Sequence, residues 1–228
     1  ARGRGEAFDL ADVDRAIEQG NYTRNRDDPR KLATPGMVDC EMEIVDAVRD
    51  GRNTFFDLCR DYKPSPGLSA EQARAAQRIL KSHDFVTLFR GGAGTGKTHT
   101  LKEIQRAVVG SDRPVLVLAP QRQQVQDLEG AGLPAQTLAH ALTTKQFPNY
   151  SVVILDEAGQ VGMHEMRDLI RALRPIRGRL VLSGDTRQHG AVAAGDALRW
   201  IEQHIPRKHV AELRTIRRQS PELARSGE

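Results

Sequence analysis

The sequence predicts an α/β fold: a parallel β-sheet covered by helices on both faces and preceded by a small helical region. From residue 67 onward, short apolar runs alternate with stretches of helical periodicity. Each run is four or five residues long, as expected of buried strands in a parallel sheet. A glycine-rich segment directly follows the first run, and in such sheets ligands bind at the carboxyl ends of the strands.

The region before residue 67 is expected to be a helical extension. Residues 8–19 and 35–49 have helical periodicity, and the polar residues 21–31 between them are expected to form a loop. Two prolines and a glycine in Lys63–Gly67 should end any helix and open a turn. The expected organisation is an extension at 1–66 and a compact α/β lobe at 67–228.

Strands and helices can be assigned in order within the lobe. The expected strands are 85–89, 115–119, 152–155, 180–183 and 210–213. The expected helices begin near residues 96, 121, 136, 163 and 195.

Residues Gly91–Thr98 read Gly-Gly-Ala-Gly-Thr-Gly-Lys-Thr, the phosphate-binding pattern G-x-x-x-x-G-K-[ST]. The alternative is a glycine-rich turn without a ligand, but a strand before and a helix after favour a nucleotide site. Glycines let the backbone N–H groups and the helix N-terminus point at phosphates. Lys97, exposed while the loop is empty, should reach the β- and γ-phosphates, and Thr98 should offer a hydroxyl to Mg²⁺. The expected nucleotide-binding residues are Gly92, Ala93, Gly94, Thr95, Gly96, Lys97 and Thr98.

The run 152–155 ends in two carboxylates, Asp156 and Glu157. Asp156 can hold Mg²⁺ beside Thr98, and Glu157 can polarise the water that attacks the γ-phosphate. The alternative is an acidic turn that caps the next helix. The glycine-rich loop upstream favours catalysis.

The run 179–183 leads into Gly184-Asp185-Thr186-Arg187-Gln188, which resembles motif III of superfamily 1 helicases. Four further segments match the Q motif and motifs Ia, Ib and IV: Leu68–Gln72, Leu118–Pro120, Ala135–Ala139 and Ile216–Gln219. The sequences of these motifs resemble those of the RecD-like, 5′-to-3′ branch of this superfamily. Residues 131–138 and 184–220 resemble the helicase part of conjugative relaxases of the MobF family, and the likeness covers about residues 35–228.

This resemblance implies a RecA-like P-loop NTPase lobe that binds ATP, Mg²⁺ and single-stranded DNA. By analogy Gln188 senses the γ-phosphate, Arg218 stabilises the transition state, and Gln72 recognises adenine. The family's DNA contacts fall on Pro120, Arg122 and Thr137. The expected catalytic residues are Lys97, Glu157, Gln188 and Arg218.

Several of these residues also have purely structural interpretations. Ser69-Ala70-Glu71-Gln72 fits a helix capping box, whose bonds the Gln72 amide could not make while reading adenine. Arg218 could be a surface arginine, and Thr137 could be a helix N-cap. The arginine run 171–179 is expected to be a solvated, basic helix end.

The chain departs from the family pattern in two ways. Pro120 is followed by Gln121-Arg122 instead of a threonine, so Arg122 is expected to take over the phosphate contact. Motifs V and VI and a relaxase metal cluster are absent from the sequence. We therefore expect the first motor lobe of a longer protein, with a second RecA-like lobe as its partner. Alone, it should not unwind DNA.

Composition sets weaker bounds. The net charge of +4 and pI of about 9.3 suit a polyanionic partner but decide nothing alone. Cys40 and Cys59 have no metal-ligand spacing, which indicates a reducing compartment such as the bacterial cytoplasm. No apolar stretch approaches the length of a membrane span. The oligomeric state is not indicated.

Two functional hypotheses follow. The first is an ATP-dependent DNA helicase or translocase lobe from a conjugative relaxase-helicase. The second is a non-translocating nucleotide-binding module that acts as a scaffold for DNA or protein. The hydrolytic residues favour the first, and a small-molecule kinase is a distant third because it would not need motifs Ib and III.

Overall fold

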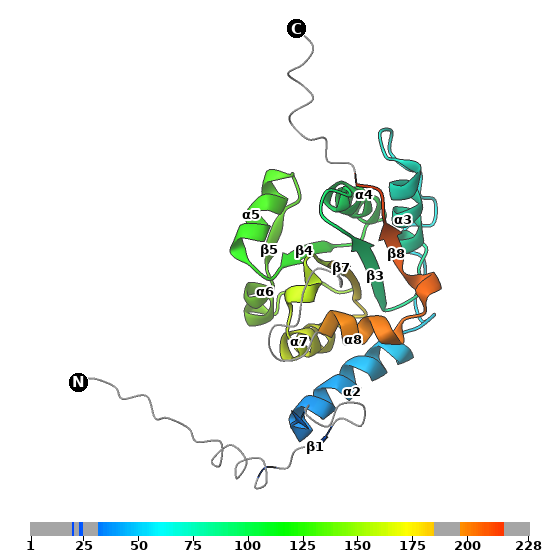
Figure 1. Ribbon diagram of the computed structural model, residues 1–228. Helices are drawn as coiled ribbons and strands as arrows, with labels where there is room; N and C mark the ends of the chain where they lie inside the picture. The colour runs from blue at the N-terminus through cyan, green and yellow to red at the C-terminus, as the bar shows by residue number, and fades with distance from the viewer. Residues whose placement is uncertain (1–19, 21–22, 25–31, 185–196, 217–228) are drawn as a thin grey trace, which may run out of the picture.

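The computed structural model describes residues 20, 23–24, 32–184 and 197–216, and centres on a six-stranded sheet (Figure 1). Its strands are β3 (Val86–Gly91), β4 (Val115–Ala119), β5 (Ala135–Thr137), β6 (Val152–Leu155), β7 (Arg179–Gly184) and β8 (Ala211–Leu213). Their spatial order is β5-β4-β6-β7-β3-β8, and all neighbours pair in parallel. The predicted fold class, a P-loop NTPase lobe on a parallel sheet, is confirmed.

Helices cover both faces of this sheet. They are α2 (Pro35–Asp50), α3 (Ala70–Leu80), α4 (Lys97–Val109), α5 (Arg122–Gly130), α6 (Leu138–Thr144), α7 (Met163–Leu173) and α8 (Ala197–His204), with short 3₁₀ turns η1 (Ala158–Gln160) and η2 (Arg207–His209). Helices α2, α6, α7 and α8 share one apolar core, and α3, α4 and α5 share the other. Strand side chains alternate between the cores: Val153 and Leu155 join the first, Val152 and Ile154 the second.

The pairing register places the functional segments side by side. Arg90 of β3 pairs with Gly184 of β7, and Leu155 of β6 pairs with Leu182 of β7. The loop after β3 and the acids after β6 therefore emerge at the same edge of the sheet, with the end of β7 between them.

Helix α2 packs on α7 and α8, and its buried residues Cys40, Ile44 and Val48 belong to the same core as the sheet. The Arg171 guanidinium donates to both carboxylate oxygens of Glu43, each at 2.6 Å, which ties α7 to α2. The domain boundary near residue 66 remains a prediction. The structure shows that α2 shares the hydrophobic core of the lobe.

The turn at Lys63–Gly67 is held against α4. Ser65 donates to Glu103 through its backbone N–H at 3.0 Å and its hydroxyl at 2.7 Å, and Arg106 binds the same carboxylate at 2.8 Å. These bonds hold the pKa of Glu103 at about 2, well below its ordinary value. This chain segment is thus bonded firmly to the helix that follows the glycine-rich loop.

Three expectations differ from the structure or fall outside it. Strand β5 was not predicted, because it has three residues and none of them is fully buried. The loop expected at 21–31 is wrong at Thr23–Arg24 (β1), which pairs antiparallel with Leu32–Ala33 (β2). The helix expected at 8–19 lies outside the described residues.

The interpretation of residues 171–179 as a solvated basic run is wrong for Arg179. Its side chain is 2% exposed and donates to the carbonyls of Phe56 and Ser82 at 2.9 and 2.8 Å. Burial lowers the pKa of Arg179 to about 10. Because the residue begins β7, it anchors the end of the sheet opposite the glycine-rich loop.

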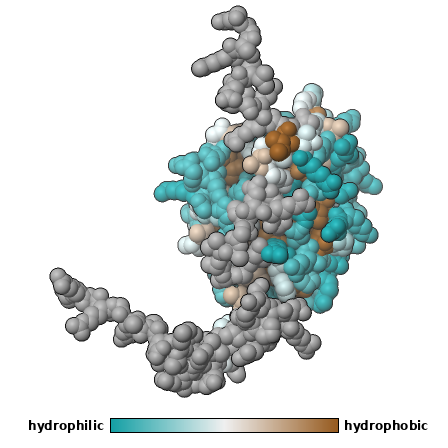
Figure 2. Space-filling model, viewed as in Figure 1, coloured by the Kyte–Doolittle hydropathy of each residue, from teal (hydrophilic) through white to brown (hydrophobic). Residues whose placement is uncertain are grey.

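Hydrophilic side chains dominate the face seen in Figure 2. Within the part of the chain that the structure describes, no helix combines the length and apolarity needed to cross a membrane.

Candidate nucleotide-binding site

The segment Gly91–Thr98 forms a tight turn between β3 and α4. Gly94 and Gly96 have φ of 76° and 86°, a left-handed conformation that favours glycine. A Cβ at Gly96 would lie 2.5 Å from Nε2 of Gln72, and one at Gly91 would lie 2.8 Å from Cγ of Lys97. The loop therefore needs glycine both for its backbone conformation and for the close approach of neighbouring side chains.

A short hydrogen bond closes the loop. Thr95, which is buried, donates from its hydroxyl to the Gly92 carbonyl at 2.8 Å. Thr100, in the first turn of α4, donates to the Gly96 carbonyl at 3.1 Å. Both bonds engage loop carbonyls. The α4 N-terminus, where unpaired N–H groups suit an anion, follows Gly96 directly.

Lys97 is paired with Glu157 in this structure, contrary to the expectation that it is exposed. Its Nζ atom lies 3.0 Å from Oε1 of Glu157, and the two side chains are 14% and 29% exposed. Glu157 has φ of 49°, a left-handed conformation that costs roughly 1–3 kcal/mol in a non-glycine residue. Such strain is typical of functional sites.

Asp156 lies beside this pair and is buried. Its Oδ1 accepts a hydrogen bond from the Ser183 hydroxyl at 2.7 Å. Burial raises the pKa of Asp156, while the Ser183 bond and the nearby Lys97 charge oppose that rise. The β6–β7 register and side-chain alternation together explain this contact, because Asp156 and Ser183 continue the face of Ile154 and Val181, toward α4.

The oxygen atoms of Thr98 and Asp156 fit a hard cation such as Mg²⁺. Within the described ranges, no group of three or more acidic, histidine or cysteine side chains could hold a metal alone. A magnesium ion here would need phosphate oxygens of a nucleotide to complete its shell, which is its usual mode of binding.

The structure shows Gln72 in the capping box. Its Oε1 accepts from the Ser69 N–H at 3.0 Å, and the Gln72 N–H donates to the Ser69 hydroxyl at 3.1 Å. Its Nε2 donates to the Gly96 carbonyl at 3.4 Å, so the side chain also contacts the loop. Adenine recognition by Gln72 remains a prediction and would require this amide to change partners.

The predicted DNA-binding residues lie at the ends of β4 and β5. Pro120 follows β4, and Arg122 is exposed at the start of α5. Thr137 caps α6 by accepting from the His140 N–H at 3.3 Å, as the structural alternative proposed. Their contacts with DNA remain predictions.

A glutamine bridge, which sequence reasoning missed, links the turn after β6 to the start of α5. Oε1 of Gln160, in η1, accepts from the amides of Gln121 at 2.8 Å and Gln124 at 3.0 Å. Gln160 lies one turn after Glu157, and Gln121 precedes α5. No local pattern reveals the bridge, because it depends on β4 and β6 being neighbours.

Two predicted catalytic residues, Gln188 and Arg218, lie outside the described residues. Their roles remain predictions. Lys97 pairs with Glu157, Asp156 lies beside that pair, and Thr98 follows Lys97 in α4, while the roles of all four residues also remain predictions. Ser183 was missed as a functional residue, because only the β6–β7 pairing brings it to Asp156.

A family model described as an AAA domain matches residues 67–226. The multifunctional conjugation protein TraI of Escherichia coli K12 is 36% identical over 210 residues, covering 84% of this chain and 12% of the relative. The RecBCD subunit RecD of Mycolicibacterium smegmatis is 31% identical over 188 residues, covering 67% of this chain and 34% of the relative.

The chain thus spans about an eighth of the TraI relative and a third of the RecD relative. A solved structure of the Pif1 helicase from Candida albicans is 21% identical, covers 65% of this chain and 40% of that chain, and has a TM-score of 0.49. TraI and RecD represent the two groups that the motifs indicated. The chain therefore belongs to the AAA domain family, as a lobe of the RecD-like branch of superfamily 1.

Proposed function

We propose that this chain is the ATP-binding and ATP-hydrolysing lobe of a DNA helicase or translocase, within a conjugative relaxase-helicase. The observation that carries the proposal is the 3.0 Å pair of Lys97 and Glu157, formed next to Asp156 at the mouth of a glycine loop. Two parallel strands, β3 and β6, thus end on the same side of the sheet. The segment after β3 supplies the phosphate-binding lysine, and the segment after β6 supplies a buried metal-binding acid and a water-polarising acid.

In the proposed reaction, the loop N–H groups bind the phosphate chain and Lys97 leaves Glu157 for the β- and γ-phosphates. Glu157, released from the lysine, accepts the proton of the attacking water. Thr98 and Asp156 would hold Mg²⁺, which would supply positive charge to neutralise the charge that develops on the phosphate oxygens. Ser183 orients Asp156 for this contact through its hydrogen bond.

The motor function is proposed by analogy. Single-stranded DNA would contact Pro120, Arg122 and Thr137, and a second RecA-like lobe would close over ATP, with 5′-to-3′ movement in the bacterial cytoplasm. The relatives support this, since TraI is a conjugation protein and RecD a subunit of the RecBCD enzyme.

The test is single-turnover hydrolysis of radiolabelled ATP, with the chain in excess and with or without single-stranded DNA. We expect slow hydrolysis that DNA increases, and Glu157→Gln should lower the rate by about 10²-fold or more while ATP still binds. Glu129→Gln, an exposed acid on α5, is the matched control. Equal hydrolysis by Glu157→Gln and wild type would refute the site. If ATP binds but DNA neither binds nor stimulates, the chain is the non-translocating module.

A further inference from the structure

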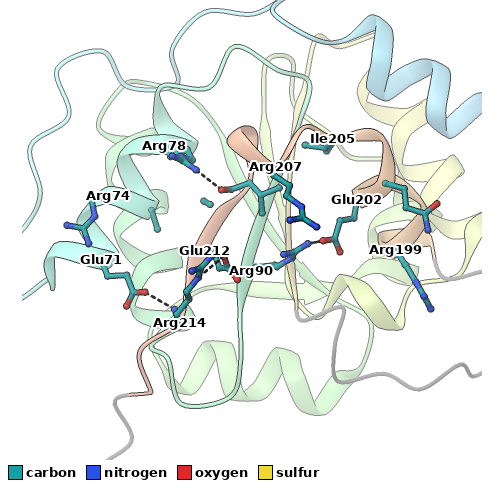
Figure 3. Close-up of a pocket in the computed structure, with 14 residues that line it drawn as sticks. Glu71, Arg74, Arg78, Arg90, Arg199, Glu202, Ile205, Arg207, Glu212 and Arg214 are labelled. Carbon is teal, nitrogen blue, oxygen red and sulfur yellow. Dashed lines mark hydrogen bonds and ion pairs between the residues drawn. The ribbon is translucent and has the colours of Figure 1, made fainter.

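A large cavity among the described residues lies away from the glycine loop, along the outer edge of β8 between α3 and α8 (Figure 3). Its volume is about 1130 Å³, and no residue of Gly91–Thr98 lines it. We call it the basic cavity, because six arginines line it: Arg74, Arg78, Arg90, Arg199, Arg207 and Arg214.

The three acids in the basic cavity are already engaged. Glu202 forms an ion pair with Arg90, and Glu212 pairs with Arg214 at 2.8 Å. Glu71 accepts from the backbone N–H groups of Arg214 at 2.7 Å and Thr215 at 3.3 Å. These three carboxylates are therefore already occupied and do not neutralise the remaining arginines.

Three guanidinium groups, those of Arg74, Arg78 and Arg207, have no anionic partner in the described part of the chain. Within the described part of the chain, Arg74 and Arg207 form no hydrogen bond or ion pair, and Arg78 donates only to the Val210 carbonyl, at 2.9 Å. Figure 3 shows Arg207 reaching into the space beside Arg90 and Glu202. Six arginines against three glutamates leave an excess of three positive charges in one concave site.

The edge of β8 argues against a peptide strand as the occupant. Arg78 binds the carbonyl that precedes β8, and Glu71 binds the two N–H groups that follow it. The backbone groups at both ends of this three-residue strand are therefore already hydrogen-bonded and could not pair with an added strand. Side-chain forks, rather than backbone groups, are the free donors here. Guanidinium forks match the paired oxygens of phosphate.

We propose that the basic cavity binds the phosphodiester backbone of single-stranded nucleic acid, with Arg74, Arg78 and Arg207 as its contacts. A volume of about 1130 Å³ has room for several phosphate groups in a row. This site goes beyond the proposed function, because the DNA contacts expected there lie at β4 and β5, across the sheet from β8. Each arginine would contact phosphate oxygens, so binding would not depend on base sequence.

The test measures binding of a labelled thymidine oligonucleotide by fluorescence anisotropy, without ATP, over a range of salt. The variant is Arg74→Gln/Arg207→Gln. The control, Arg60→Gln/Lys81→Gln, removes the same charge from exposed positions that do not line the cavity. Melting curves check that both variants are folded.

We expect the cavity variant, and not the control, to bind the oligonucleotide more weakly. Each phosphate contact on a single strand adds about 0.7 to the salt slope, so losing two should make the loss of affinity between roughly 50 and 200 mM salt about seven-fold smaller. Equal weakening by both double variants would mean that only overall charge matters, and would overturn the proposal. No binding by the wild-type chain at low salt would also overturn it.

An acidic peptide is tested in parallel with labelled polyglutamate. If the cavity variant loses polyglutamate binding but binds the oligonucleotide as the wild type does, the occupant is a protein segment and the proposal is wrong. This test needs neither ATP binding nor hydrolysis. Its failure would leave the proposed ATPase function untouched.

Discussion

The Nζ atom of Lys97 lies 3.0 Å from Oε1 of Glu157, so the residue expected to bind phosphates is held by the residue expected to activate water. A nucleotide must break this ion pair when it enters. Partly exposed pairs of this kind are typically worth up to about 1 kcal/mol, so the pair opposes ATP only weakly. It also keeps the acid in place before substrate arrives.

Lys97→Ala should abolish binding of ATP·Mg²⁺ and leave the fold intact, because the lost ion pair contributes little to stability. Glu157→Gln should bind ATP at least as tightly as the wild type, since Lys97 is then free. Calorimetric titration measures both affinities, and melting curves check the fold. Unchanged ATP affinity in Lys97→Ala would remove the phosphate-loop assignment.

Ser183→Ala should raise the Mg²⁺ concentration needed for ATP binding, because Asp156 loses the hydrogen bond that orients it. It should also lower the free energy of unfolding by about 1–3 kcal/mol, since a buried carboxylate loses a donor. Ser151→Ala is the matched control: this serine is equally buried, and its hydroxyl has no partner in the described structure. Identical Mg²⁺ titrations of the two variants would contradict the role of Ser183.

Gln72→Ala and Ser69→Ala separate the two interpretations of Gln72. Each removes half of the capping box and should lower stability by about 1 kcal/mol. Only Gln72→Ala should also reduce the preference for ATP over GTP, by roughly 1–3 kcal/mol if its amide reads adenine. Competition binding with both nucleotides checks this. If both variants change only the melting temperature, Gln72 is a cap and nothing more.

Glu103→Gln should destabilise the chain at neutral pH but not in strong acid. The folded-state pKa of about 2 lies below the ordinary 4.5, so the ionised carboxylate stabilises the fold above pH 4.5 and loses this effect as the pH falls to about 2. The contribution at pH 7 is up to about 3 kcal/mol. Urea unfolding at pH 7 and at pH 2 measures this contribution, with Glu129→Gln as the exposed control. A difference that persists at pH 2 would exclude the carboxylate's charge as the cause.

The order of strands and helices in the lobe could be predicted from sequence because each buried strand is a continuous apolar run. Strand β5 could not, since Ala135–Thr137 is short and lies only half-buried at the sheet edge. Arg179 misled the prediction because it follows three arginines of a helix end. Its burial depends on carbonyls of Phe56 and Ser82, which are distant in sequence.

Within the site, the glycine turn and the two acids after β6 could be predicted from sequence, because local chain geometry controls them. The sequence could not indicate the partners of these groups. The contact of Ser183 with Asp156 arises because β6 and β7 are neighbours in the sheet. The contact of Glu157 with Lys97 arises from the strand order and from the left-handed backbone of Glu157. Lys97 therefore appeared exposed on sequence grounds, although the fold supplies a carboxylate for it.

The bridge from Gln121 and Gln124 to Gln160 differs in kind from the ion pair beside it. Amides carry no net charge, so neither dissolved ions nor acidity should loosen this link, whereas a partly exposed ion pair is screened to some extent as ionic strength rises. At high salt, the end of β4 would stay fastened to the turn after Glu157 even as the attraction between Lys97 and Glu157 weakens. The lobe thus holds its two strand ends together independently of the ionic conditions that govern nucleic acid binding.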